Sequence, residues 1–204
     1  MKKDSLAFAL SGTFFGLLVG WIIGSQHGQP PVPVAPPTTT QSEAAPGGAT
    51  PPPFDAAQAA DLERQATARP TDAAVRAMLG NLYFDGERYG QAATWYEASL
   101  KLDPNAVEVS TDLAVAYYYT QQADRALAQL DHSLKLDPAH LKTLLNQGII
   151  RAFGKQDLKG AAESWQRVVA IAPTSEEGRR AQQGLDGLKA AHASSPGVSG
   201  GIAQ

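Results

Sequence analysis

The sequence predicts an all-α fold in which pairs of helices stack into a solenoid. Four prolines follow one another at spacings of 34, 34 and 35 residues: Pro70, Pro104, Pro138 and Pro173. A fixed period of this size is typical of repeat architectures. Residues 54–192 are rich in alanine, leucine and charged residues, and none of their segments alternates as a half-buried strand would. We therefore expect helices in this part of the chain and no sheet.

The first 25 residues are expected to form a single-pass transmembrane signal-anchor. Residues 5–24 carry no charge, and these 20 residues would span about 30 Å as a helix, the thickness of the hydrocarbon layer. A cleaved signal peptide is the alternative, although its apolar stretch is usually about 7–15 residues long and ends at small residues spaced like Ala-x-Ala. Lys2 and Lys3 precede the segment. The positive-inside rule therefore predicts a cytoplasmic amino terminus and an extracytoplasmic remainder, which in a bacterium is periplasmic.

Glycine recurs every four residues within this segment, at Gly12, Gly16, Gly20 and Gly24. Small residues at that spacing let two membrane helices approach closely. The stripe is therefore a candidate packing site, either for a second copy or for another membrane protein. The alternative is that glycine is simply common in membrane helices.

Residues 26–53 are expected to form a disordered linker. Nine of the 14 prolines lie between Pro30 and Pro53, and such a composition cannot bury enough apolar surface to fold. The expected role is a spacer that gives the following domain reach, with a proline-ligand motif as the alternative. Residues 193–204 are expected to be a disordered tail.

Eight helices are expected after the linker, each separated from the next by turn residues. Their predicted ranges are 55–68, 72–85, 89–102, 106–119, 123–135, 140–152, 158–171 and 175–190. Capping side chains are expected before four of them, at Asp55, Thr71, Asn105 and Thr174. Segment 55–69 is the second helix of a degenerate leading unit, and 175–192 is a polar capping helix.

Three repeat units are expected, at 73–106, 107–140 and 141–175, and the third has one residue inserted between its helices. Equivalent small residues would let the two helices of a unit cross closely: Gly80, Ala114, Gly148, Ala92, Ala126 and Ala161. Larger residues would fill the space around each crossing, among them Leu79, Tyr83, Tyr96, Leu130 and Trp165. Proline then ends each second helix, because it cannot continue one.

These positions resemble the tetratricopeptide repeat (TPR). The pattern's tryptophan is replaced by Arg76 and Ser110 in the first two units. The third unit departs further, with Gln147 in place of leucine and Arg151 in place of tyrosine. The resemblance implies a right-handed superhelix whose first helices line a concave peptide-binding groove.

Transferring that groove onto this sequence gives eighteen positions, Glu108 among them. Eleven of these are the candidate binding residues: Met78, Asn81, Phe84, Asp112, Val115, Tyr118, Tyr119, Lys142, Asn146, Ile149 and Phe153. Family members that bind chaperones carry a clamp of basic residues and asparagines for a carboxylate. Asn81 and Lys142 match it, whereas Ala77, Asp112 and Asn146 do not. The clamp is therefore not expected, and capture of a carboxyl terminus through Lys142 alone stays as an alternative.

No catalytic, metal or cofactor site is expected, and the protein is predicted not to be an enzyme. The chain has no cysteine, and its four histidines, at 27, 132, 140 and 192, lack metal-ligand spacing. Segment 148–155 lacks the spacing and the Ser/Thr of a phosphate-binding loop. The net charge of −3 disfavours nucleic acid as a partner, and no small-molecule substrate is expected.

The predicted function is that of a membrane-anchored adaptor or chaperone that holds a peptide or an amphipathic helix of a partner outside the cytoplasm. Segments 62–70, 80–83 and 162–173 also resemble the TPR accessory subunits of bacterial cytochrome c biogenesis. That resemblance implies presentation of apocytochrome c to the haem lyase complex. The alternatives are a structural scaffold of another envelope complex, in secretion, outer-membrane or division machinery, and a secreted soluble TPR protein.

Overall fold

A computed structural model describes residues 54–194, and these residues form eight α-helices and one π-helical turn, without a strand. The elements are α2 (Ala56–Ala68), α3 (Ala73–Asp85), α4 (Tyr89–Leu100), α5 (Val107–Tyr119), α6 (Ala123–Leu136), α7 (Leu141–Ile149), η1 (Ile150–Gly154), α8 (Leu158–Ile171) and α9 (Glu176–Ser194). The predicted helices and the all-α solenoid are confirmed.

The predicted membrane helix with its glycine stripe, the linker and most of the tail lie outside the described residues. Among the helices from Ala56 onward, none is both long and apolar enough to cross a membrane.

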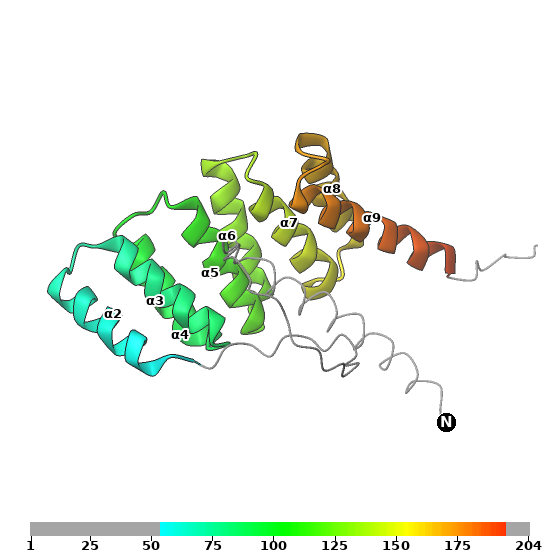
Figure 1. The fold of residues 1–204 in the computed structure, drawn as a ribbon. Coiled ribbons are helices and arrows are strands. Elements are labelled where there is room, and N and C mark those ends of the chain that lie inside the picture. Colours follow the sequence, from blue (N-terminus) through cyan, green and yellow to red (C-terminus); the bar gives the residue numbers. More distant parts are fainter. Residues whose placement is uncertain (1–53, 195–204) are drawn as a thin grey trace, which may run out of the picture. The chain divides into compact units, whose positions relative to one another are not determined.

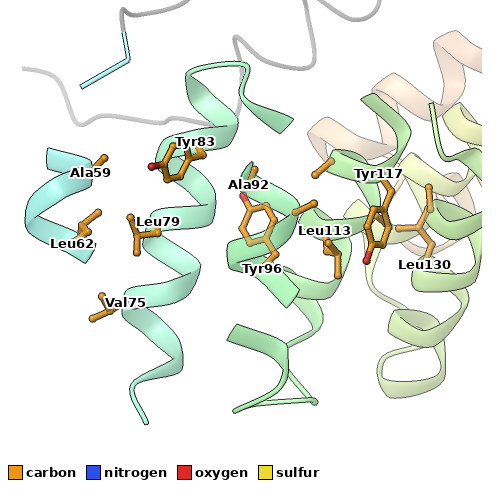
Figure 2. Packing of buried hydrophobic residues seen from close by; sticks show 14 of the residues in the cluster. Ala59, Leu62, Val75, Leu79, Tyr83, Ala92, Tyr96, Leu113, Tyr117 and Leu130 are labelled. Carbon is orange, nitrogen blue, oxygen red and sulfur yellow. The ribbon is translucent and has the colours of Figure 1, made fainter. Parts of the chain in front are cut away.

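Each helix packs against the helices that precede and follow it in the sequence (Figure 1). The pairs α3–α4, α5–α6 and α7–α8 correspond to the three predicted units, while α2 packs on α3 and α9 packs on α8 and α7. Since one pair cannot bury its own apolar side, stacking completes the core. Leu62 of α2, for example, faces Leu79 of α3 (Figure 2).

The predicted caps are correct only at α2, where Asp55 accepts hydrogen bonds from the amides of Ala57 and Gln58. The other three predictions are one residue too early. Asp72 caps α3, Ala106 precedes α5 without a side-chain hydrogen bond, and the Ser175 hydroxyl accepts from the Gly178 amide in α9. The cap is the residue directly before the first helical one, so an error of one residue in a helix start moves the cap.

Small residues at the helix crossings pack directly against the large ones, as predicted. A Cβ atom added to Gly80 would lie 2.4 Å from the Tyr96 ring, and one added to Gly148 would lie 2.3 Å from Trp165 Nε1. In the second unit, Ala114 and Leu130 occupy the equivalent positions, and both are fully buried. Glycine thus accompanies an aromatic ring, and alanine accompanies the smaller leucine.

The inserted residue of the third unit lies within its first helix, so the prediction of an insertion between the helices is wrong. Gln121 and Gln156 adopt positive φ, 63° and 57°, at equivalent places in the turns after the first helices. Helix α7 begins 34 residues after α5, but these turns lie 35 residues apart. The π-helical turn η1 takes up the difference, and the amide of Lys155 donates to the carbonyl of Ile150 at 3.1 Å.

A network of polar side chains, which we call the polar layer, runs through the third unit and joins it to α6 of the second. It consists of Asp131, Gln147, Arg151 and Ser164. Gln147 is buried, and its Nε2 donates to Asp131 at 2.8 Å while its Oε1 accepts from the Ser164 hydroxyl at 2.9 Å. Arg151 in turn donates to the Ser164 oxygen at 3.1 Å. The two departures from the TPR pattern therefore belong to one network, and the core on its two sides divides into two apolar clusters.

Burial raises the pKa of all six tyrosines, to about 12 for Tyr89 and Tyr117. Hydrogen bonds to carboxylates add to this at Tyr83, whose hydroxyl donates to Glu63 at 2.9 Å, and at Tyr117, whose hydroxyl donates to Glu97 at 2.7 Å. The folded chain therefore holds these phenolic protons more tightly than an unfolded chain would.

We expect the fold to lose stability steeply as the pH rises above about 10, the ordinary tyrosine pKa. A group with a raised pKa contributes stability that is complete below its unfolded value and is lost as the pH rises through its folded value. Phenolate absorbance and circular dichroism, recorded together in an alkaline titration, should therefore change in one common step. Gradual ionisation near pH 10 with intact helices would contradict this expectation.

Candidate functional site

One side of the three first helices carries residues at matching positions, spaced i, i+4, i+7 and i+11, and we call this set the candidate face. On a helix of 3.6 residues per turn such residues share one side, and this holds for every member below except Phe153, which lies in the π-helical turn η1. The set consists of Ala74, Met78, Asn81 and Asp85 on α3, Glu108, Asp112, Val115 and Tyr119 on α5, and Lys142, Asn146, Ile149 and Phe153 on α7 and η1. Nine of the eleven predicted site residues belong to it, and Phe84 and Tyr118 precede its last positions by one residue.

The predicted residues differ widely in exposure. Met78 is 52% exposed and Phe153 is 37% exposed, whereas Val115 and Asn146 keep only 7% and 6%. Val115 therefore belongs to the supporting core rather than to the outer surface. No hydrogen bond joins the Asn146 amide to another residue of the described part, and its polar atoms are not among those sealed from solvent. This amide can thus pair with a bound chain.

Four aromatic side chains form a cluster at the carboxyl ends of α3 and α5, which we call the aromatic cluster. The Tyr89 and Tyr119 rings stack with centroids 4.2 Å apart, and Phe84 meets them edge-on at 5.1 and 5.8 Å. Tyr118 lies 5.9 Å from Tyr119. Offset and edge-on contacts are the favoured aromatic geometries. The sequence prediction missed Tyr89, because it took candidates from the first helices only and Tyr89 opens α4.

A cluster of charged groups, which we call the charged cluster, lies toward the amino ends of α5 and α7. Lys142 Nζ lies 2.6 Å from Asp112 Oδ1 and 3.3 Å from Glu108 Oε2. His140 Nε2 lies 2.8 Å from Glu108 Oε1, and it donates, because a carboxylate only accepts. Glu108 is one of the groove positions transferred from the family, whereas His140 is not.

The pKa values in the charged cluster reflect this pairing. Burial alone would lower the pKa of Lys142, but the Asp112 and Glu108 carboxylates outweigh it and raise that pKa. Burial likewise favours a higher pKa for Glu108, yet the His140 hydrogen bond and the Lys142 charge bring it below its usual value. Burial raises the pKa of Asp112 despite the nearby lysine. Lys142 is thus a cation already held by two carboxylates.

Asn81 of α3 pairs with a buried tyrosine of α4. Its Oδ1 accepts a hydrogen bond of 2.8 Å from the Tyr96 hydroxyl. Burial raises the pKa of Tyr96, and the carboxylates of Asp112 and Asp85 add to the effect. Asn81 is therefore held against the second helix of its own unit.

Two hollows open on the other side of α5 and α7, between successive second helices. The first is lined by Leu113, Tyr117 and neighbours from α4 and α6, with a volume of about 370 Å³. The second, of about 430 Å³, has Gln147 and Arg151 at the equivalent positions. Both are lined by charged side chains of each sign. Within residues 54–194, no group of three or more histidine, aspartate or glutamate side chains could hold a metal ion.

Comparison with known proteins supports a TPR fold. The family model "TPR repeat" matches residues 80–121. The first TPR of Spaghetti (RPAP3), solved with the HSP90 peptide SRMEEVD, superposes with a TM-score of 0.54 at 27% identity, over 60% of this chain and 94% of that one. The predicted resemblance to TPR proteins is confirmed.

Two curated relatives are much longer than this chain. The cytochrome c-type biogenesis protein CycH of Pseudomonas aeruginosa is 34% identical over 128 residues, which are 61% of this chain and 31% of CycH. The human protein O-mannosyl-transferase TMTC3 is 29% identical over 110 residues, 54% of this chain and 12% of TMTC3. The chain therefore spans less than a third of either relative. The similarity to CycH supports the narrower resemblance to cytochrome c biogenesis proteins.

Proposed function

We propose that this chain of TPR repeats is an adaptor or chaperone that holds a segment of a partner polypeptide against the candidate face. The aromatic cluster carries the proposal. Stacked tyrosines with few rotatable bonds are the kind of anchor on which peptide interfaces depend. Met78 on α3 and Phe153 on η1 add exposed apolar side chains.

The spacing of the face fits an amphipathic helix or an extended peptide. Apolar side chains of the partner would pack on the aromatic cluster and Phe153, as helix-in-groove recognition requires. The Asn146 amide is available for a main-chain hydrogen bond. Binding of a polypeptide needs no further chemistry from the described residues.

We also propose that residues 5–24 anchor the chain in the cytoplasmic membrane and that residues 26–53 tether the repeats on its extracytoplasmic side. The support is the uncharged segment with Lys2 and Lys3 before it. An alkaline phosphatase fused to the carboxyl end in a bacterium should then be active, because this enzyme folds only outside the cytoplasm. An inactive but stable fusion would contradict the orientation.

The similarity to CycH favours apocytochrome c as the partner. In this proposal the repeats hold its carboxy-terminal helix for the haem lyase complex. A labelled peptide of that helix should bind the full chain, purified in detergent micelles, with a dissociation constant of tens of micromolar or tighter. No binding in that range would rule out this partner.

Tyr118→Ala and Phe153→Ala should each weaken the binding about fivefold to tenfold, because each removes an aromatic anchor worth about 1 kcal/mol or more. Ile171→Ala is the matched control, since Ile171 is an exposed apolar residue of α8 outside the candidate face. Binding that survives both aromatic substitutions would place the partner elsewhere on the chain.

A further inference from the structure

We propose that the candidate face selects its partner by charge: it takes a segment with a basic side chain near an apolar anchor, and it rejects acidic tails. This inference rests on the proposed function, because it specifies the chemistry of the segment that the face holds. The occupant is a lysine- or arginine-bearing stretch of polypeptide. Its basic group would lie at Glu108 and Asp112, and its apolar group at the aromatic cluster.

The first reason is that the Lys142 ammonium is already paired with two carboxylates of the chain itself. Its ammonium contacts Asp112 at 2.6 Å and Glu108 at 3.3 Å. A ligand carboxylate that drew Lys142 away would leave the partly buried Asp112 without its counter-ion, which is costly. The alternative that Lys142 captures a carboxyl terminus therefore loses its basis.

The second reason is the balance of charge. Two carboxylates, Glu108 and Asp112, face the single ammonium of Lys142, and the His140 ring contacts Glu108. The Glu108 side chain is 65% exposed, so a basic group of a ligand can reach it. Complementary charge steers association and penalises like-charged partners.

The third reason is the separation of the two anchors. Asp112 and Tyr119 lie on one side of α5, seven residues apart, which is about 10 Å along a helix. The same separation corresponds to two turns of a bound helix or to about three residues of extended chain. The face therefore specifies both the sign of the charge and its distance from the apolar group.

A displayed peptide library tests the inference. All its peptides share a fixed apolar stripe, and the positions around the stripe carry lysine or glutamate with equal frequency. The library is selected on the full chain in detergent micelles at pH 8. Enriched peptides should carry lysine, and changing that lysine to glutamate in a resynthesised peptide should weaken binding about fivefold or more. The synthetic peptide SRMEEVD should not compete.

Enrichment without charge bias, or enrichment of glutamate, would overturn the inference and leave the proposed function standing. Failure to enrich any peptide would count against the proposed function and the inference together. The bias should also shrink between about 0.05 and 0.5 M salt, because exposed charges are screened. A bias that does not respond to salt would contradict an electrostatic origin.

The double variant Glu108→Gln/Asp112→Asn should abolish the preference for lysine and let SRMEEVD compete, because Lys142 is then released from both carboxylates. The control is Asp124→Asn/Glu163→Gln, which removes the same number of charges from α6 and α8, outside the candidate face. An equal loss of the preference for lysine in the control would show that the preference comes from the overall charge of the protein and not from this face. Circular dichroism of both variants checks that the fold is kept.

Discussion

Replacing Trp165 with alanine is expected to lower the free energy of unfolding by about 3–5 kcal/mol, the usual cost of deleting a buried tryptophan. The ring is 3% exposed and fits against two glycines on different helices, Gly148 of α7 and Gly184 of α9. Its Nε1 donates to the carbonyl of Leu145 at 3.2 Å. Because glycine has no side chain that could fill the space, the void would persist.

Denaturant unfolding followed by circular dichroism measures this loss. Trp165→Phe should cost much less, because it keeps an aromatic ring between the two glycines and gives up mainly the indole hydrogen bond. Ile171→Ala is the matched control on the same helix, where an exposed side chain should change stability by about 0.5 kcal/mol or less. A loss below about 1 kcal/mol for Trp165→Ala would show that the crossing can collapse onto the void.

Gly80→Ala is expected to cost about 1–3 kcal/mol through overpacking. The added methyl group would lie 2.4 Å from the Tyr96 ring. That ring cannot easily move, because it is 2% exposed and its hydroxyl donates to Asn81 at 2.8 Å. The expected loss follows from sterics alone, since alanine is the better helix former.

The double variant Gly80→Ala/Tyr96→Leu should recover part of that loss, because it copies the Ala114–Leu130 pair of the second unit. The two substitutions should therefore show a favourable coupling energy of about 1 kcal/mol or more in a double-mutant cycle. Gly90→Ala is the control, since nothing lies within 4 Å of the Cβ atom it would add. Simple additivity of the two changes would contradict a direct contact as the cause.

The repeat architecture was predictable because its determinants are local. Proline at 104, 138 and 173 must end a helix wherever it stands, and a small residue at a fixed place in each period requires close packing. The stripe of face residues follows from helical periodicity in the same way. Eight of the eleven predicted residues therefore share one side of α3, α5 and α7, while Phe153 lies in the π turn.

The features that the sequence did not predict depend on contacts between different helices. The 35-residue interval shows that the third unit has one extra residue, but not where that residue lies. Its position depends on Ile150 and Ala152, which are buried in different apolar clusters. The π turn accommodates the extra residue while both side chains stay buried. Tyr89 joins the aromatic cluster from the second helix of its unit. The pairing of Lys142 with Asp112 joins neighbouring repeats, and no spacing along one helix reveals it.

Because of the polar layer, we expect the repeats to unfold in two cooperative units rather than one. Stability in a solenoid is roughly the sum of the units and of the interfaces between neighbours. We expect the interface between the second and third units to open at lower free energy than its neighbours, because the bond of the polar layer that crosses it, from Gln147 to Asp131, can be replaced by water. The third unit, with α9, then forms its own unfolding unit.

Such an opening would separate Lys142 from Asp112 and so divide the candidate face between two independently folding halves. A partner that touches both halves binds only the closed form, and by mass action it stabilises that form in proportion to its own concentration and affinity. Addition of the partner should therefore slow amide hydrogen exchange more in α7 and α8 than in α3, and this difference would report the linkage. Recognition of the partner and closure of this interface would then be thermodynamically linked.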